Sequence, residues 1–77
     1  MIEEISTAIR EGIEGAQVSV QLEGNRALIT VVSEVFEPLS RVRKQQAVYA
    51  CIEEFLRDGR LHAVTIRAIT PAEAAGV

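Results

Sequence analysis

The sequence predicts an α+β fold whose elements follow in the order αββαβα. Two segments have apolar residues at helical spacing. Between them, two shorter segments rich in alternating or β-branched residues flank a tight turn, and a third strand-like run follows the second helix. The chain has 77 residues, nearly half of them hydrophobic. We therefore expect one domain, residues 1–77, with a small core.

The first helix is predicted from four isoleucines at helical spacing, Ile2, Ile5, Ile9 and Ile13. Charged residues take the opposite face, as in a helix that buries one side. Gly12 and Gly15 mark its end, because glycine commonly follows the last helical turn.

A β-hairpin is predicted next. In AQVSVQLEG, residues 16–24, apolar and polar side chains alternate between the two faces of a strand. RALITVVS, residues 26–33, is rich in the β-branched residues that favour strands. The stretch Glu23–Arg26, EGNR, is typical of a hairpin turn.

A longer helix is predicted from Arg41 to about Asp58. Ser40 is suited to cap its first turn, and Gly59 stops it. Residues 34–40 before it are expected to form a loop around Pro38. The apolar stripe of the helix consists of Val48, Cys51, Ile52 and Phe55, with Leu56 at the margin.

The C-terminal part predicts one more strand and a short helix. RLHAVTIRAI, residues 60–69, has the composition of a strand. TPAE, Thr70–Glu73, has the pattern of a capping box with proline at the first helical position. A short terminal helix should follow and end near Gly76.

The topology predicts two separate candidate sites at opposite ends of the domain. If the second and third strands are neighbours, the long helix joins them by a right-handed parallel crossover. The result is a three-stranded mixed sheet with helices packed on it. The third strand then starts at the end that holds the turn Glu23–Arg26. We therefore expect His62 at that end, and SRVRKQQ, residues 40–46, with Thr70 at the other.

His62 is the only histidine in the chain. Strand alternation places it on the face of Val64, Ile66 and Ala68, which favours a partly buried histidine at the edge of the core. A strand's first residue can also lie at the rim, where neutral imidazole is a common metal ligand. One histidine cannot build a metal site alone. A metal bound here would be shared with a partner chain or another ligand.

Cys51 is the other side chain to consider as a ligand. Its place inside the apolar stripe favours packing. As the only cysteine it cannot form an internal disulfide, which suits a reducing compartment. A Cys–His catalytic pair is disfavoured because the sequence offers no oxyanion site and no third orienting group.

The second candidate site is basic. Arg41, Arg43 and Lys44 lie in the first turn of the long helix, where a helix N-terminus and cations together attract an anion such as phosphate. The alternative is a solvated surface partly paired with Glu34 and Glu37. No G-x-x-G loop occurs, so the likeness to a KH nucleic-acid clamp is incomplete. The net charge of −3 supplies no general attraction for nucleic acid.

The sequence contains no motif of a known catalytic type. A P-loop, a C-x-x-C pair and a G-x-S-x-G elbow are all absent from it, so we expect no enzyme. The start has no basic region followed by a long apolar run. We therefore expect no signal peptide, no transmembrane span and a cytoplasmic location.

Several stretches together resemble one known family. They are Phe36, RKQQAVY at Arg43–Tyr49, LHAVTI around His62 and Ala63, and TPAE at Thr70–Glu73. With these residues the chain resembles the BolA family, and more closely its IbaG (YrbA-like) branch. The resemblance covers nearly the whole chain and is most specific from Val32 to Glu73. It implies a fold similar to a type II KH domain, in agreement with the order αββαβα.

The resemblance also implies a partner and a cofactor. BolA-like proteins pair with monothiol glutaredoxins of the CGFS type, and the pair can hold a [2Fe–2S] cluster. The glutaredoxin and glutathione supply thiolates, and the BolA-like chain supplies a histidine that matches His62. No cofactor is expected in the isolated chain.

The resemblance leaves alternative functions open. The family is linked to transcription and to acid or cell-envelope stress. A DNA-binding regulator acting through Arg41, Arg43 and Lys44 is therefore the first alternative. The second is an interaction module, such as a homodimer, with no metal role.

The sequence departs from the family pattern at two places. Many members have histidine or cysteine in the turn between the first two strands, but EGNRA has neither. Arg26 takes the place where histidine is common. We therefore consider Asn25 and Arg26 as contacts for the glutathione carboxylates or for an acidic residue of the glutaredoxin. Ala74 stands where the usual TPxEW ending has tryptophan.

Overall fold

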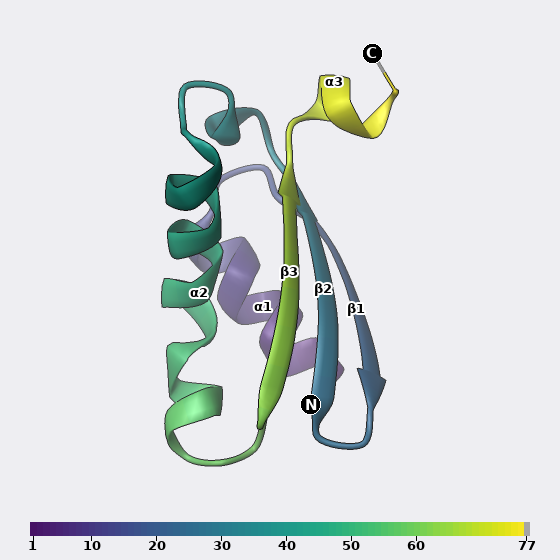
Figure 1. Ribbon diagram of the computed structural model, residues 1–77, viewed down its shortest axis with the longest axis vertical. Helices are drawn as coiled ribbons and strands as arrows, with labels where there is room; N and C mark the ends of the chain where they lie inside the picture. Colours follow the sequence, from purple (N-terminus) through teal and green to yellow (C-terminus); the bar gives the residue numbers. More distant parts are fainter. Residues whose placement is uncertain (77) are drawn as a thin grey trace.

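The computed structural model describes residues 1–76 and has the predicted order of elements. These are α1 (Ile2–Gly12), β1 (Gln17–Glu23), β2 (Arg26–Val32), a short 3-10 helix η1 (Glu34–Phe36), α2 (Arg41–Arg57), β3 (Ala63–Ile69) and α3 (Pro71–Ala74) (Figure 1). Val77, the last residue of the predicted domain 1–77, lies outside the described residues.

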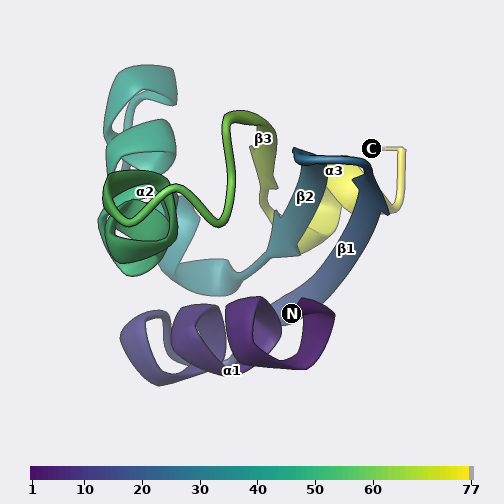
Figure 2. The ribbon, with the colours of Figure 1, turned by 90° about the horizontal axis from the view of Figure 1, so that it is seen from below.

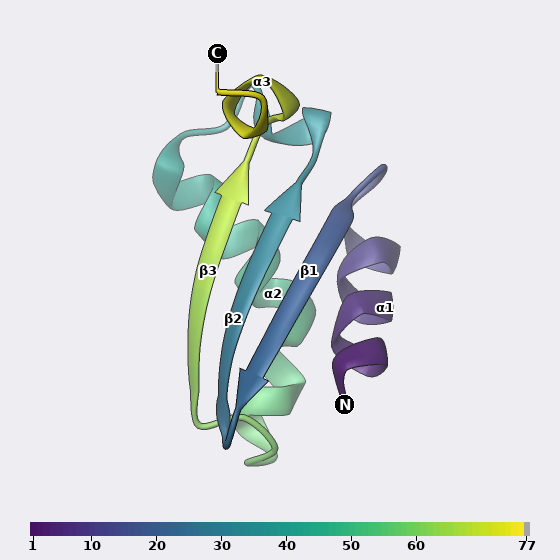
Figure 3. The same cartoon turned by 90° about the vertical axis from the view of Figure 1, so that its right-hand side faces the viewer.

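The sheet is mixed, as predicted, and its strand order is β1-β2-β3. β1 and β2 are antiparallel, and the register pairs Glu23 with Arg26 at the hairpin end. β2 and β3 are parallel, and Arg26 pairs with Ala63. α1 and α2 lie on one face of the sheet (Figure 2), and Figure 3 looks onto the other face. The chain therefore reaches β3 through α2 by the expected crossover.

The core lies between the sheet and the two long helices. Alternation on β2 directs Ala27, Ile29 and Val31 toward the helices, where all three are fully buried. Ile5, Ile9 and Ile13 of the first amphipathic segment are buried as predicted, but Ile2 at its start is exposed. The remaining buried apolar residues are Phe36, Val48, Ile52, Phe55 and Leu61.

The predicted helix starts are confirmed in their hydrogen bonds. The Arg43 backbone N–H donates to Ser40 Oγ at 3.2 Å. The Glu73 N–H donates to Thr70 Oγ1 at 3.2 Å, and the Thr70 N–H donates to Glu73 Oε1 at 2.9 Å. These contacts are the capping box expected from TPAE, and each satisfies a donor that a helix start would otherwise leave free.

The predicted start of the third strand is wrong by three residues. β3 begins at Ala63 rather than at residue 60, because local contacts hold the preceding segment in a loop. The Arg60 N–H donates to Asp58 Oδ1 at 3.1 Å, and the Leu61 N–H donates to the Phe55 carbonyl at 2.9 Å. Residues 34–36, expected to be plain loop, form η1.

Candidate functional site

His62 lies at the hairpin end of the sheet, as the topology predicted. It directly precedes β3 and follows the loop that leaves α2. The start of β3 is at the lower end of the molecule in Figure 1. The β1–β2 turn at Gly24 and Asn25 lies beside it. The His62 N–H donates to the Asn25 carbonyl at 2.9 Å, and the Ala63 N–H donates to the same oxygen at 3.4 Å.

The His62 side chain is exposed, so the expectation of a half-buried core histidine is wrong. Strand alternation was the basis for that expectation, but His62 stands one residue before the strand. The buried neighbour is Leu61, which is 1% exposed. Leu61 therefore anchors this stretch in the core, while His62 remains available to a partner.

The imidazole has one polar side-chain contact within residues 1–76. Asn25 Nδ2 lies 3.3 Å from His62 Nδ1. A shallow hollow beside this pair is lined by Glu23, Asn25, Arg26, His62 and Ala63. Asn25 and Arg26, considered above as partner contacts, are thus brought together with His62.

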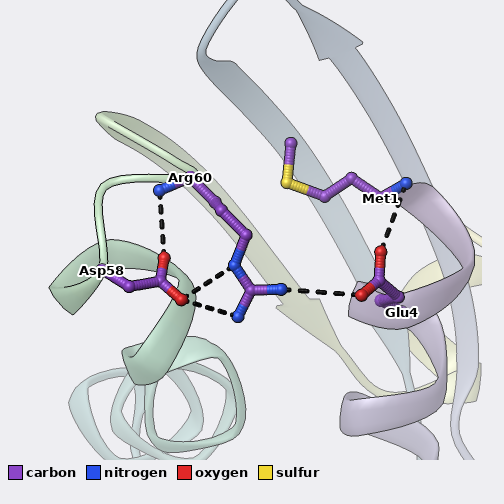
Figure 4. A network of polar contacts seen from close by, with 4 residues as sticks. All are labelled: Met1, Glu4, Asp58 and Arg60. Atoms are coloured by element: carbon purple, nitrogen blue, oxygen red, sulfur yellow. Dashed lines mark hydrogen bonds and ion pairs between the residues drawn. The ribbon is translucent and has the colours of Figure 1, made fainter.

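A second network holds the loop that leads to His62. Arg60 donates to Asp58 Oδ2 from Nε at 2.8 Å, and its Nη2 lies 2.8 Å from the same oxygen. Its Nη1 lies 3.5 Å from Glu4 Oε2 of α1 (Figure 4). The guanidinium also stacks over the Phe55 ring at 4.1 Å, a favourable cation–π contact. Arg60 therefore ties the α2–β3 loop to α1.

The hydrogen bond between Asp58 and Arg60 is the main cause of the pKa shifts within this network. The side-chain hydrogen bond from Arg60 lowers the pKa of Asp58 below its ordinary value. The same bond raises the pKa of Arg60. Both groups therefore stay ionised over a wide pH range, so the ion pair behind His62 persists.

The site can supply one metal ligand rather than a complete metal site. Across residues 1–76, no cluster of three or more His, Cys, Asp or Glu side chains could hold a metal ion. Cys51 lies on α2, partly buried, where its thiol donates to the Ala47 carbonyl at 3.4 Å. Burial raises the pKa of this thiol, which disfavours the thiolate that metals require.

The basic segment lies at the opposite end of the molecule, also as predicted. Arg41 and Arg43 are exposed. Lys44 is not free: its Nζ lies 3.1 Å from Glu73 Oε1, and its side chain is only 15% exposed. The predicted neighbours Glu34 and Glu37 are not its partners. The pairing links the start of α2 to α3.

Some contacts had no clear signal in the sequence. The Arg60–Glu4 and Lys44–Glu73 pairs join residues far apart in the chain. Gln45 Nε2 donates to the Ile66 carbonyl at 2.7 Å on the outer edge of β3. Asp58 and Arg60 lie only two residues apart just after a helix end, so their spacing could have indicated a contact.

Fold and site together define a class of protein. It is a small α+β protein with a β1-β2-β3 mixed sheet and a lone exposed histidine beside a hairpin turn. The family model described as BolA-like protein matches residues 16–73. The chain therefore belongs to the BolA-like family. The acid stress protein IbaG of Escherichia coli K12 is 40% identical over 70 residues, which cover 91% of this chain and 83% of IbaG.

Solved structures agree on the fold. A BolA protein homologue from Coxiella burnetii superposes with a TM-score of 0.82 at 21% identity, covering 97% of this chain and 96% of that one. BolA1 from Arabidopsis thaliana gives a TM-score of 0.81 at 23% identity, covering 92% of each chain. At these identities the likeness establishes the BolA fold alone. Over residues 1–76, none of the helices has the length and apolar character needed to span a membrane.

Proposed function

We propose that this protein is a non-enzymatic partner of a monothiol CGFS glutaredoxin. In this role it would share a [2Fe–2S] cluster through His62, in cytoplasmic iron–sulfur trafficking or sensing. The observation that carries the proposal is His62 itself, exposed beside a turn with one ring nitrogen held by Asn25. The similarity to a protein named for acid stress supports a role in the stress response.

The ligand inventory supports a shared rather than a resident cluster. This chain offers one exposed imidazole, and the described part of it contains no three-ligand group. The glutaredoxin and glutathione would supply the thiolates. Nitrogen ligation in place of sulfur raises the reduction potential of such a cluster. The residues of this chain would present the imidazole and hold the partner.

Arg26 is the residue proposed to hold the partner. It is exposed on the rim of the hollow that contains His62, and no ion pair within residues 1–76 engages it. A guanidinium binds carboxylates with two parallel hydrogen bonds. Arg26 would therefore bind a glutathione carboxylate or an acidic residue of the glutaredoxin, and Asn25 would border that contact.

The test is a spectroscopic titration of the chain into cluster-loaded CGFS glutaredoxin. We expect the wild-type chain to change the visible absorption and circular dichroism, because an imidazole replaces another ligand. His62→Ala should abolish that change. Gln46→Ala, an exposed substitution on α2, is the matched control and should behave as wild type.

The same titration separates ligation from partner binding. Arg26→Glu should weaken the complex but preserve its spectrum at saturation, whereas Arg67→Glu makes the same charge change on an exposed β3 residue and should have little effect. A wild-type chain that forms no complex, or a His62→Ala complex with the wild-type spectrum, would contradict the proposal. His62→Ala should remain folded, because the side chain it removes is exposed.

A second candidate function is a DNA-binding transcriptional regulator. It is favoured by the exposure of Arg41 and Arg43 at the start of α2, which leaves two cations open to phosphates. Lys44 is engaged by Glu73. Two cations make few phosphate contacts, so binding would be weak and would fall with salt.

A further inference from the structure

Asn25 contacts His62 through both its main chain and its side chain. Its carbonyl accepts from the N–H groups of His62 and Ala63, at 2.9 and 3.4 Å. Its side-chain amide meets His62 Nδ1 at 3.3 Å. One turn residue therefore fixes the backbone that carries the imidazole and also contacts the ring.

The turn holds Asn25 in a defined place. Gly24 and Asn25 form a two-residue connection closed by the Glu23–Arg26 pair of the β1–β2 register. Gly24 has φ of 62°, a conformation that favours glycine. On the other side, the backbone N–H of buried Leu61 donates to the Phe55 carbonyl. The asparagine and the histidine thus face each other from two anchored segments.

This contact distinguishes the two ring nitrogens. Neutral imidazole has one N–H and one bare nitrogen, and the partner of one nitrogen decides which tautomer is present. The Asn25 amide occupies Nδ1, while Nε2 has no hydrogen-bond partner within residues 1–76. An amide carries both a donor NH₂ and an acceptor oxygen. After a half-turn of its side chain, Asn25 can therefore accept from Nδ1–H as well as donate to bare Nδ1.

We propose that Asn25 is the positioning residue of His62. It reserves Nδ1 and leaves Nε2 as the nitrogen that binds metal. In the free chain, Asn25 Nδ2–H donates to bare Nδ1 and the ring proton sits on Nε2. On ligation the Nε2–H bond breaks and solvent takes that proton. Nδ1 gains a proton from solvent, the Nε2–metal bond forms, and the amide turns to accept from Nδ1–H.

The functional meaning of this assignment rests on the proposed function, because Nε2 is the nitrogen that would bind an iron of the cluster. Histidine ligands commonly donate their other N–H to an oxygen that orients the ring, and loss of such partners weakens metal binding by about 10-fold to 100-fold. Here the orienting oxygen would come from the turn in which the sequence lacks a second ligand.

The test uses the isolated chain, whose single histidine makes every ring signal unambiguous. Long-range ¹⁵N NMR at alkaline pH measures the tautomer of the neutral His62 ring. Pentaammineaquaruthenium(II) serves as the metal probe, and ¹⁵N NMR of the adduct shows which nitrogen it binds. The variants are Asn25→Ala, which removes the partner, and Asn25→Asp, which can only accept. Both keep the backbone carbonyl of residue 25.

In wild type we expect the Nε2–H tautomer in the free chain and ruthenium on Nε2 in the adduct. Asn25→Asp should reverse the free tautomer to Nδ1–H, because a carboxylate cannot donate, and should speed labelling at Nε2. Asn25→Ala should show the tautomer ratio of a blocked histidine in the same buffer and label both nitrogens. Equal urea midpoints would show that wild type and both variants are equally stable. If Asn25 had a purely structural role, the midpoints of the variants would be lower than that of wild type.

Two results would overturn the inference: ruthenium on Nδ1 of the wild-type chain, or one tautomer ratio shared by wild type and Asn25→Ala. Neither depends on a glutaredoxin or a cluster. A failure of the glutaredoxin titration would instead remove the proposed function and leave the ring assignment intact.

Discussion

At the scale of single residues, Gly12 allows α1 and α2 to approach each other. A Cβ at this position would lie 2.6 Å from Cys51 Sγ, which is closer than carbon and sulfur tolerate. The thiol is partly buried and donates to the Ala47 carbonyl. Glycine and cysteine therefore form a matched pair in the helix contact, which explains the cysteine by packing.

Gly12→Ala should destabilise the protein through this contact. Overpacking typically costs about 1–3 kcal/mol, and the better helix propensity of alanine offsets up to about 1 kcal/mol of that. We expect a net loss of about 1 kcal/mol in the free energy of unfolding, measured by urea denaturation. In a Cys51→Ala background the same change should be neutral or stabilising. An equal loss in both backgrounds would show that the sulfur is not the obstacle.

His62 illustrates what a sequence can predict about one residue. Its place beside the hairpin turn follows from the order of the elements and from the rule that a helix joins two neighbouring parallel strands by a crossover. The structure confirms this place. Its exposure could not be predicted, because that depends on where β3 begins. The start at Ala63 is set by the Asp58–Arg60 and Leu61–Phe55 contacts, which periodicity does not encode.

At the scale of elements, α3 is four residues long and depends on contacts at its start. Glu73 Oε1 accepts from the Thr70 N–H at 2.9 Å and from Lys44 Nζ at 3.1 Å. So short a helix has little stability of its own. One carboxylate therefore closes the capping box and also joins α3 to α2.

Acid should release this attachment. The hydrogen bond from the Thr70 N–H, and next the one from Lys44, lower the pKa of Glu73 below its ordinary value of 4.5. A carboxyl whose folded pKa is depressed stabilises the native state above the unfolded pKa, and this stabilisation is lost as pH falls through the folded pKa. We expect the urea midpoint of wild type to fall from pH 4.5 downward.

Glu73→Gln isolates this contribution. At neutral pH the variant should have a lower urea midpoint than wild type. The difference between the two midpoints should become smaller as acid protonates the Glu73 carboxyl of wild type. Asp58, whose pKa is also lowered, titrates in both chains and cancels in the comparison. The effect should be small because the carboxyl is exposed and screened. If the difference in urea midpoint stayed constant with pH, the charge of Glu73 would not contribute to stability.

Helix starts were predictable where a capping side chain sets them. Ser40 and the Thr70–Glu73 box begin their helices because the capping side chain lies within three residues of its donor. η1 was not predicted, although Ser33 caps it by accepting from the Val35 N–H. Its three residues are too few for a helical period to be recognised.

At the scale of the whole molecule, the two candidate sites lie at opposite ends of a body with principal extents of 35 × 19 × 19 Å. The β1–β2 turn and the start of β3, which His62 directly precedes, are at one end, and the start of α2 with α3 is at the other (Figure 1). The parallel crossover explains this separation, since α2 must run the length of β2 before β3 starts. The long-range pairs Arg60–Glu4 and Lys44–Glu73 could not be predicted, because many surface charges could have met at each end.

This separation predicts that the two ends function independently. The double variant Arg41→Glu, Arg43→Glu reverses both exposed cations at the start of α2 and leaves the Lys44–Glu73 pair in place. Energetic effects of sites more than about 10 Å apart that share no partners usually add. The variant should therefore give the wild-type spectrum and affinity with cluster-loaded glutaredoxin. Any binding to a DNA duplex, followed by fluorescence anisotropy at low salt, should disappear.

His62→Ala should show the converse pattern, with the glutaredoxin spectrum lost and any DNA binding kept. Loss of the glutaredoxin complex in the double arginine variant would contradict independence and would mean that the partner spans the length of α2. If wild type binds no DNA even at low salt, the two arginines are a solvated surface. The proposed function then rests on the histidine end of the molecule alone.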